Sequence, residues 1–291
     1  MLAQNFHSFT TNAMGATAVV ALHAAILCFM VAALMAVAAL FQPRRMRMLW
    51  AECVGGAGAA ALGTYFIARF SEAGTEPFSN LFEVINLAAL CVALTCFAIA
   101  RVRKLKTLAA FAFPGIAVIF VVNLLFADSA AQGRASSGLL VVHVVLTLMS
   151  YGLFFMAAIA AVMFLLQERA LKKHRDPAVI RDFPPLESLR RLVNTCILTG
   201  LPLLTLGLGL GFVAMSDQGW EAILRNPKIP PSVVLWGVLL LAAAGRWTGR
   251  LHGRRHLYMV LAGFALVLMT FVGLGVWSRS QATAPQQQEV R

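Results

Sequence analysis

The chain has 291 residues, of which 60% are hydrophobic and 12% are charged, and its mean hydropathy is +0.79. A soluble domain of this length would contain fewer apolar residues, so the composition favours an integral membrane protein. The formal net charge of +12 is concentrated in particular loops, which favours contact with anionic lipid and argues against nucleic acid as the partner.

Eight apolar segments follow one another along the chain, and each is interpreted as a transmembrane helix. The predicted segments are residues 16–41, 49–68, 79–100, 107–127, 137–173, 192–215, 232–245 and 257–277. A polar outer tail, residues 1–15, precedes them, and a polar tail, residues 278–291, is expected to be disordered. The sequence therefore predicts an all-α, polytopic membrane protein with one eight-helix membrane domain at residues 16–277.

The distribution of basic residues predicts the orientation of these helices. The loops after the first, third, fifth and seventh segments hold 18 Lys and Arg residues, whereas the other loops and the tails hold 6. An excess of Lys and Arg marks the cytoplasmic side of a membrane protein. We therefore expect a multi-pass protein of a bacterial inner (cytoplasmic) membrane with both termini on the outer, periplasmic side.

The fifth segment carries polar residues inside an apolar run. His143 lies about four residues into that run, roughly 6 Å below its start at 1.5 Å per residue. Thr147, Ser150 and Tyr151 follow at spacings of four, seven and eight residues, which places all four side chains on one face of a helix. Because lipid does not solvate such a face, we expect it to line a cavity or the protein interior.

Other polar residues are predicted at the same outer level of the membrane. His23 enters the first segment from the outer side, and Glu83, Asn123 and Trp236 lie near the outer ends of their segments. Two histidines at one depth could ligate a metal or a haem iron, since neutral imidazole is a common ligand. The alternative for His23 and for His143 is a hydrogen bond to a neighbouring helix. We predict that Glu83, Asn123 and Trp236 line an outer cavity together with the polar face of the fifth segment.

Motifs for catalysis or for a resident metal ion are missing from the sequence. The five cysteines lie inside apolar segments without a CxxC spacing, and no HExxH motif, phosphate loop or nucleophile–base pattern occurs. We therefore expect neither an enzyme nor a metal site. The expected membrane midplane carries no charge, which disfavours an ion-coupled transporter.

Several stretches resemble the cytochrome c assembly membrane proteins, the CcsA/CcmC/HemX-like family. They are ARFSEAGTEPFSNLFEVINLAAL, HVVLTLMSYGLFFMAAIAAVMFLLQER and the FPPLESLRR loop, and the resemblance extends over about residues 65–277. The pattern is closest to the small HemX-like and YpjD-like branch, because the tryptophan-rich segment of the haem-handling members is replaced by SDQGWEAILRNPKIPPS. The resemblance implies eight helices, and it carries the role of an external haem ligand onto His143 alone. A second external histidine after the last helix is absent from VWSRSQATAP.

Three hypotheses about function follow. The first is a haem-handling protein of cytochrome c biogenesis that works with other assembly components, with His143 as a candidate axial ligand and His23 as a further candidate. The second is a membrane accessory protein that kept the fold without haem and acts through helix contacts with a partner, for instance in metal-ion homeostasis. The third is a small-solute transporter.

Overall fold

The structure is a computed structural model, and it describes most of the predicted membrane domain. The described residues are 15–41, 45–73, 81–103, 105–124, 138–172, 183–216, 229–248 and 253–283. Within these ranges the secondary structure is helical, which confirms the predicted all-α class for the described part of the chain. The predicted N-terminal tail up to residue 14, and the C-terminal tail from residue 284, lie outside the described residues.

Eight α-helices and one short 3₁₀ helix make up this described part. They are α2 (Ala16–Phe41), α3 (Arg45–Ala73), α4 (Leu81–Arg103), η2 (Lys106–Leu108), α5 (Ala109–Leu124), α6 (Gly138–Lys172), α7 (Leu186–Ala214), α9 (Ile229–Trp247) and α10 (Arg254–Thr283). The first and fifth apolar segments agree with α2 and α6 to within a residue at either end.

Other helices extend beyond the apolar segments, because hydropathy marks the apolar part of a helix and not its ends. Helix α7 begins at Leu186, directly after Pro185, whereas its apolar segment begins at residue 192. Helix α10 continues to Thr283, so the first six residues of the predicted disordered tail are helical. The residue that precedes a proline is disfavoured in the helical conformation, and Pro285 follows close behind this helix end.

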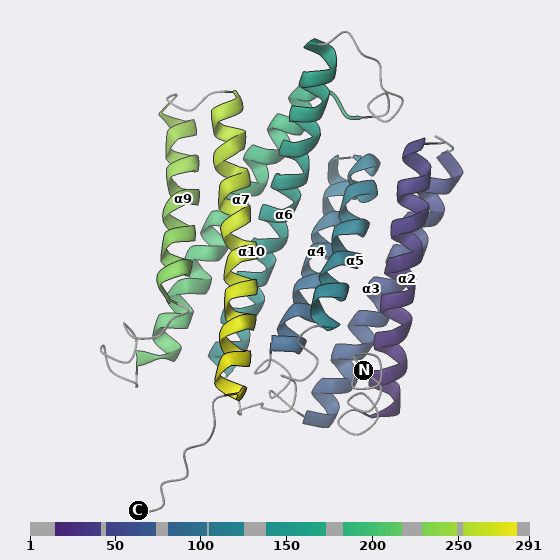
Figure 1. Ribbon diagram of the computed structural model, residues 1–291, viewed down its shortest axis with the longest axis vertical. Coiled ribbons are helices and arrows are strands. Elements are labelled where there is room, and N and C mark those ends of the chain that lie inside the picture. The colour runs from purple at the N-terminus through teal and green to yellow at the C-terminus, as the bar shows by residue number, and fades with distance from the viewer. Residues whose placement is uncertain are drawn as a thin grey trace, which may run out of the picture.

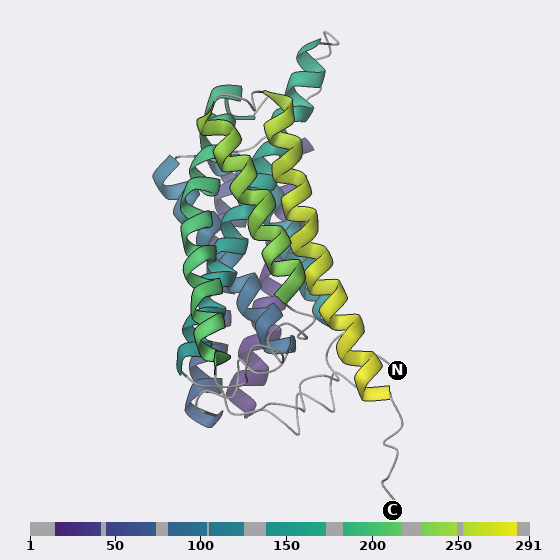
Figure 2. The same cartoon turned by 90° about the vertical axis from the view of Figure 1, so that its left-hand side faces the viewer.

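The helices form an up-and-down bundle in which successive helices run in opposite directions (Figures 1 and 2). Figure 1 shows α2 and α3 on one side, α4 and α5 in the middle, and α6, α7, α9 and α10 on the other side. Helix α2 packs on α3 and α5, whereas α6 packs on α4, α7 and α10. Helices α2, α4, α6 and α9 begin at the lower end of Figure 1, so the helix ends next to the loops that were predicted to share one side of the membrane lie at one end of the bundle.

Charge separates the two ends of the bundle. Among the Lys and Arg side chains that the structure describes, Arg69 lies at the lower end of Figure 1, and the others lie at the upper end. The residues at the upper end are Arg47, Arg101, Arg103, Arg169, Lys172, Arg190, Arg191, Arg254 and Arg255. The fold thus gathers the basic residues at one end, as a positive-inside orientation requires.

Among the helices that the structure describes, four are long and apolar enough to cross a membrane. These spans are Ala16–Ala39, Leu81–Arg103, Gly138–Lys172 and Leu186–Ala214, and shorter apolar helices occupy Ala109–Asn123 and Ile229–Gly245. The outward faces of these helices remain apolar, as Leu34 on α2 and Leu206 on α7 illustrate with exposed fractions of 70% and 60%. Such faces suit a lipid environment, and the chain is a multi-pass membrane protein.

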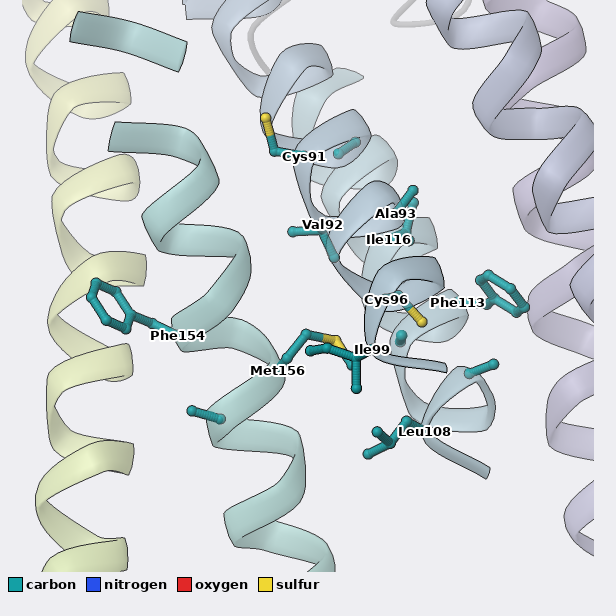
Figure 3. Close-up of a cluster of buried hydrophobic side chains, with 14 of the residues drawn as sticks. Cys91, Val92, Ala93, Cys96, Ile99, Leu108, Phe113, Ile116, Phe154 and Met156 are labelled. Carbon is teal, nitrogen blue, oxygen red and sulfur yellow. The ribbon is translucent and has the colours of Figure 1, made fainter. Parts of the chain in front are cut away.

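The centre of the bundle is apolar and is filled from α4, α5 and α6. Figure 3 shows Ile99 of α4 beside Met156 of α6, with Cys96 of α4 turned toward the side of Phe113 of α5, whose ring points toward α2 and α3. Phe113 packs against Phe29 of α2 with a ring-centroid distance of 6.4 Å. This packing holds α4 between α5 and α6, and it thereby fixes the polar residues at the lower end relative to one another.

Candidate functional site

Glycines on α7 bring that helix unusually close to α6. A Cβ atom added at any of three α7 glycines would lie under 3.0 Å from a side chain of α6, so only glycine permits this spacing. The facing pairs are Gly200 with Phe154, Gly207 with Thr147, and Gly211 with His143. The pairs advance in opposite directions along the two helices, as an antiparallel register requires. The polar face of α6 therefore packs against this glycine seam and not against lipid.

His143 lies at the lower end of this seam and is half-buried. Its Nδ1 atom is 2.5 Å from the carbonyl oxygen of Gly207. Because a carbonyl oxygen can only accept, Nδ1 must carry a proton and donate it, so the neutral ring has its lone pair on Nε2. Within the described part of the chain, Nε2 has no hydrogen-bond partner. Gly211 leaves room for the ring, since a Cβ atom at that position would lie 2.8 Å from Nδ1 and Cε1.

Two hydroxyl groups on the same face of α6 bond to their own helix. Thr147 Oγ1 donates to the carbonyl oxygen of His143 at 2.7 Å, and Ser150 Oγ donates to that of Thr147 at 2.6 Å. Thr147 and Ser150 are buried, and Tyr151 is half-buried. The predicted shared face therefore exists, and the hydroxyls of Thr147 and Ser150 are satisfied within α6. The imidazole of His143 instead bonds to another helix, α7.

A second polar cluster joins α3, α4 and α5 at the same end of the bundle. Glu83 of α4 has no exposed surface, and its two carboxylate oxygens accept from different α3 residues. Tyr65 donates its hydroxyl to Oε2 at 2.7 Å, and Arg69 donates Nε–H to Oε1 at 3.0 Å. A buried carboxylate is stable only when it is paired and hydrogen-bonded, so α3 supplies what Glu83 requires.

Two buried asparagines continue this cluster toward α5. Asn123 Nδ2 donates to Asn86 Oδ1 at 2.9 Å, and both side chains are almost completely buried. Asn86 Nδ2 and Asn123 Oδ1 lack partners within the described residues. Asn86 lies one helical turn beyond Glu83 on α4, so one face of α4 meets α3 and then α5.

Trp236 and His23 form hydrogen bonds that do not involve His143. Trp236 Nε1 donates to Thr205 of α7 at 2.9 Å, and Thr205 is exposed, two residues away from the Gly207 seam. His23 is exposed on α2, with Nδ1 2.8 Å from the carbonyl oxygen of Val19. Helices α4 and α5 separate α2 from α6 in Figure 1. The structure does not bring the two candidate histidines together.

The comparison with known families gives this arrangement its context. Residues 78–280 match the family described as cytochrome c assembly protein. The chain belongs to this family. The resemblance predicted from the sequence motifs is therefore confirmed.

Three relatives illustrate the range of this cytochrome c assembly family. The HemX protein of Brevibacillus brevis is 30% identical over 166 residues, which cover 54% of this chain and 58% of HemX. The cytochrome c biogenesis protein CcsA of Guillardia theta is 25% identical over 228 residues, covering 71% and 75% of the two chains. The inner membrane protein YpjD of Escherichia coli K12 is 29% identical over 140 residues, covering 48% and 52%. The matches to HemX and YpjD span little more than half of each relative, and no solved structure matches the chain.

Some of the site residues lie inside the region that matches the cytochrome c assembly family, and others lie before it. His143, Glu83, Asn86 and Asn123 fall within residues 78–280. Tyr65 and Arg69 of α3, like His23 of α2, lie before the matched region. The α2–α3 hairpin thus supplies both donors that bind the carboxylate of Glu83 in the family region.

Our sequence analysis missed Tyr65, Arg69 and Asn86 as site residues. A local signal was available, because Tyr65 and Arg69 are four residues apart on α3, and Glu83 and Asn86 are three apart on α4. Each pair shares a face near the outer end of its segment, which predicts two polar faces at one level. The spacing does not show which helix each face contacts.

The residues around His143 fit one axial bond to a haem iron. A ligating histidine commonly donates its other ring nitrogen to a carbonyl group, which fixes the tautomer and the ring orientation. The bond from His143 to Gly207 has this form. Within the described residues, no group of three or more His, Cys, Asp and Glu side chains could hold a metal ion.

Proposed function

We propose that this protein handles haem during cytochrome c biogenesis and that His143 holds the haem iron on the outer side of the membrane. Membership of the cytochrome c assembly family supports a role in cytochrome c biogenesis or a related haem process. The observation that carries the proposal further is the Nδ1 bond to Gly207, which leaves the Nε2 lone pair available. Bound haem would supply the iron that accepts this lone pair.

The rest of the proposed role is binding and not catalysis. The chain's own residues would orient the imidazole, through Gly207, and leave space beside it, through Gly211. We infer that the protein works with other cytochrome c assembly components or with another membrane protein that receives or delivers haem. A single strong ligand suits such a role, because haem held by one axial bond is released more easily than haem held by two.

The test is the absorbance of the protein from cells grown with ample haem. We expect the wild-type protein to show a substoichiometric Soret band, and His143→Ala to abolish it. His23→Ala is the matched control, and its Soret band should remain, since His23 lies on the far side of α4 and α5. Membrane levels of both variants should equal that of the wild type, because one histidine contributes little to the insertion of the apolar helices.

Two outcomes would contradict the proposal. A wild-type protein without haem, even in native membranes, would leave His143 as a hydrogen-bonding residue between α6 and α7. The accessory function without haem would then be favoured. A His143→Ala protein that keeps the full Soret band would show that haem binds elsewhere.

The proposal includes eight membrane spans with both termini on the periplasmic side of a bacterial inner membrane. The basic residues at the upper end of the bundle support this orientation (Figure 1). We expect periplasmic reporters fused after Arg134 or at the C-terminus to be active, and reporters fused at Asp176 or Gly253 to be silent. The reverse pattern of reporter activity would place His143 on the cytoplasmic side and would remove the proposed outer haem site.

A further inference from the structure

At the basic end of the bundle, an arginine of α4 forms a hydrogen bond to α7. Arg103, in the last turn of α4, donates Nη2–H to Thr195 Oγ1 of α7 at 2.8 Å. Thr195 Oγ1 in turn donates to the carbonyl oxygen of Arg191, so the hydroxyl both accepts and donates. Arg103 is exposed. Arg191 is also exposed, and it lies on the same face of α7 as Thr195, one turn closer to the start of that helix. The Arg103 guanidinium is therefore held beside Thr195, and Arg191 lies one turn away on α7 with its guanidinium bonded to Glu187.

Positive charge exceeds negative charge at this position. Glu187 is shared between Arg190 and Arg191 at 3.2 and 3.1 Å, and its side chain is 54% exposed. Within the described part of the chain, Arg103 has no carboxylate partner. The guanidinium of Arg103 therefore keeps donors available for an external anion.

The helix faces next to these arginines are apolar and exposed. On α4, Val102 next to Arg103 is 76% exposed, and on α7, Leu198 and Leu206 are 42% and 60% exposed. Leu198 lies three residues deeper in the bundle than Thr195, and Leu206 lies eight residues beyond Leu198, about 12 Å at 1.5 Å per residue. An apolar surface thus runs from the arginines toward the middle of the bundle.

We propose that Arg103 and Arg191 form a binding site for the phosphate headgroup of one anionic lipid, with its acyl chains along α7. Charge complementarity selects an anionic headgroup, because a zwitterionic lipid would offer these cations no net charge. The planar guanidinium matches the geometry of a phosphate group, which makes arginine more suitable than lysine here. The apolar side chains below the headgroup select a lipid over free phosphate. The site lies at the opposite end of the bundle from His143 and is independent of haem.

The experiment is native mass spectrometry of the full-length protein released from nanodiscs. The nanodiscs contain phosphatidylcholine alone or phosphatidylcholine with phosphatidylglycerol, and a third sample adds inorganic phosphate to phosphatidylcholine. We expect the wild type to retain one phosphatidylglycerol molecule. Arg103→Gln should weaken that retention about tenfold, because a charge-assisted hydrogen bond is lost. Arg103→Lys should give an intermediate retention, since it keeps the charge and loses the planar fork.

Arg255→Gln is the matched control. Arg255 is an exposed arginine at the same end of the bundle but on α10, and its replacement should leave the bound lipid unchanged. An equal loss in Arg255→Gln would show that the lipid is attracted by the overall charge, and it would overturn the proposed site. Retention of inorganic phosphate as strong as that of the lipid would likewise overturn it. Circular dichroism of each variant checks that the helices are intact, so that a lost lipid is not confused with a lost fold.

Discussion

Replacing Arg69 by glutamine is expected to destabilise the protein by about 3–5 kcal/mol, because it would leave a buried carboxylate without its countercharge. Glu83 has no exposed surface, and the side chain of Arg69 is only 14% exposed, so water cannot replace the lost partner. Thermal unfolding in a mild detergent, followed by circular dichroism, would measure the change. Glu83→Gln should destabilise the protein less, since a neutral amide at this position no longer demands a countercharge and can still accept from Tyr65.

Two further variants test the cause of this effect. Arg254→Gln removes an exposed ion pair with Glu168 that joins α6 and α10 at 2.8 Å, and water can solvate the remaining carboxylate, so only a small change is expected. In the double variant Arg69→Met with Glu83→Met, apolar side chains replace the buried pair, and much of the stability lost in Arg69→Gln should return. If Arg69→Gln unfolds at the same temperature as the wild type, the ion pair at Glu83 does not contribute to holding α3 against α4.

Replacing Gly211 by alanine is expected to weaken haem binding about 10–100-fold, the range found when a ligand's supporting contacts are removed. The new Cβ atom would lie 2.8 Å from two atoms of the His143 ring, so the ring must move away from the Gly207 carbonyl group. The helix itself should not suffer, because alanine favours the helical conformation over glycine by about 1 kcal/mol. Titration of the purified protein with haem, followed at the Soret band, would measure the loss. This prediction depends on the proposed haem site.

Gly209→Ala is the matched control for this change. Gly209 lies two residues away on α7, and a Cβ atom at that position would meet nothing within 4 Å. The two variants gain the same methyl group on the same helix, but only the variant at Gly211 touches the imidazole. Equal haem affinity in Gly211→Ala and Gly209→Ala would show that the position of the His143 ring does not matter for binding.

The sequence by itself determined the membrane class, the all-α secondary structure of the described residues and the family. These follow from local properties, since an uninterrupted apolar run specifies a helix whatever surrounds it. The shared face of His143, Thr147 and Ser150 was equally predictable, because helical periodicity fixes which side chains lie above one another. Helix ends were less predictable, because the charged first turn of α7 and the polar last turns of α10 continue helices beyond their apolar parts.

Only the tertiary structure decided which groups these faces meet. His143 bonds to a carbonyl group 64 residues away, and Glu83 bonds to two side chains on the preceding helix. His23 has a depth similar to that of His143 in the sequence, yet α4 and α5 separate the two helices in the bundle. The depth of a residue in the membrane follows from its own segment. The residues that surround it depend on how all the helices pack. The glycine seam of α7 and the apolar core between α4, α5 and α6 determine that packing, and they place the ring of His143 where its Nε2 atom is left without a partner among the described residues.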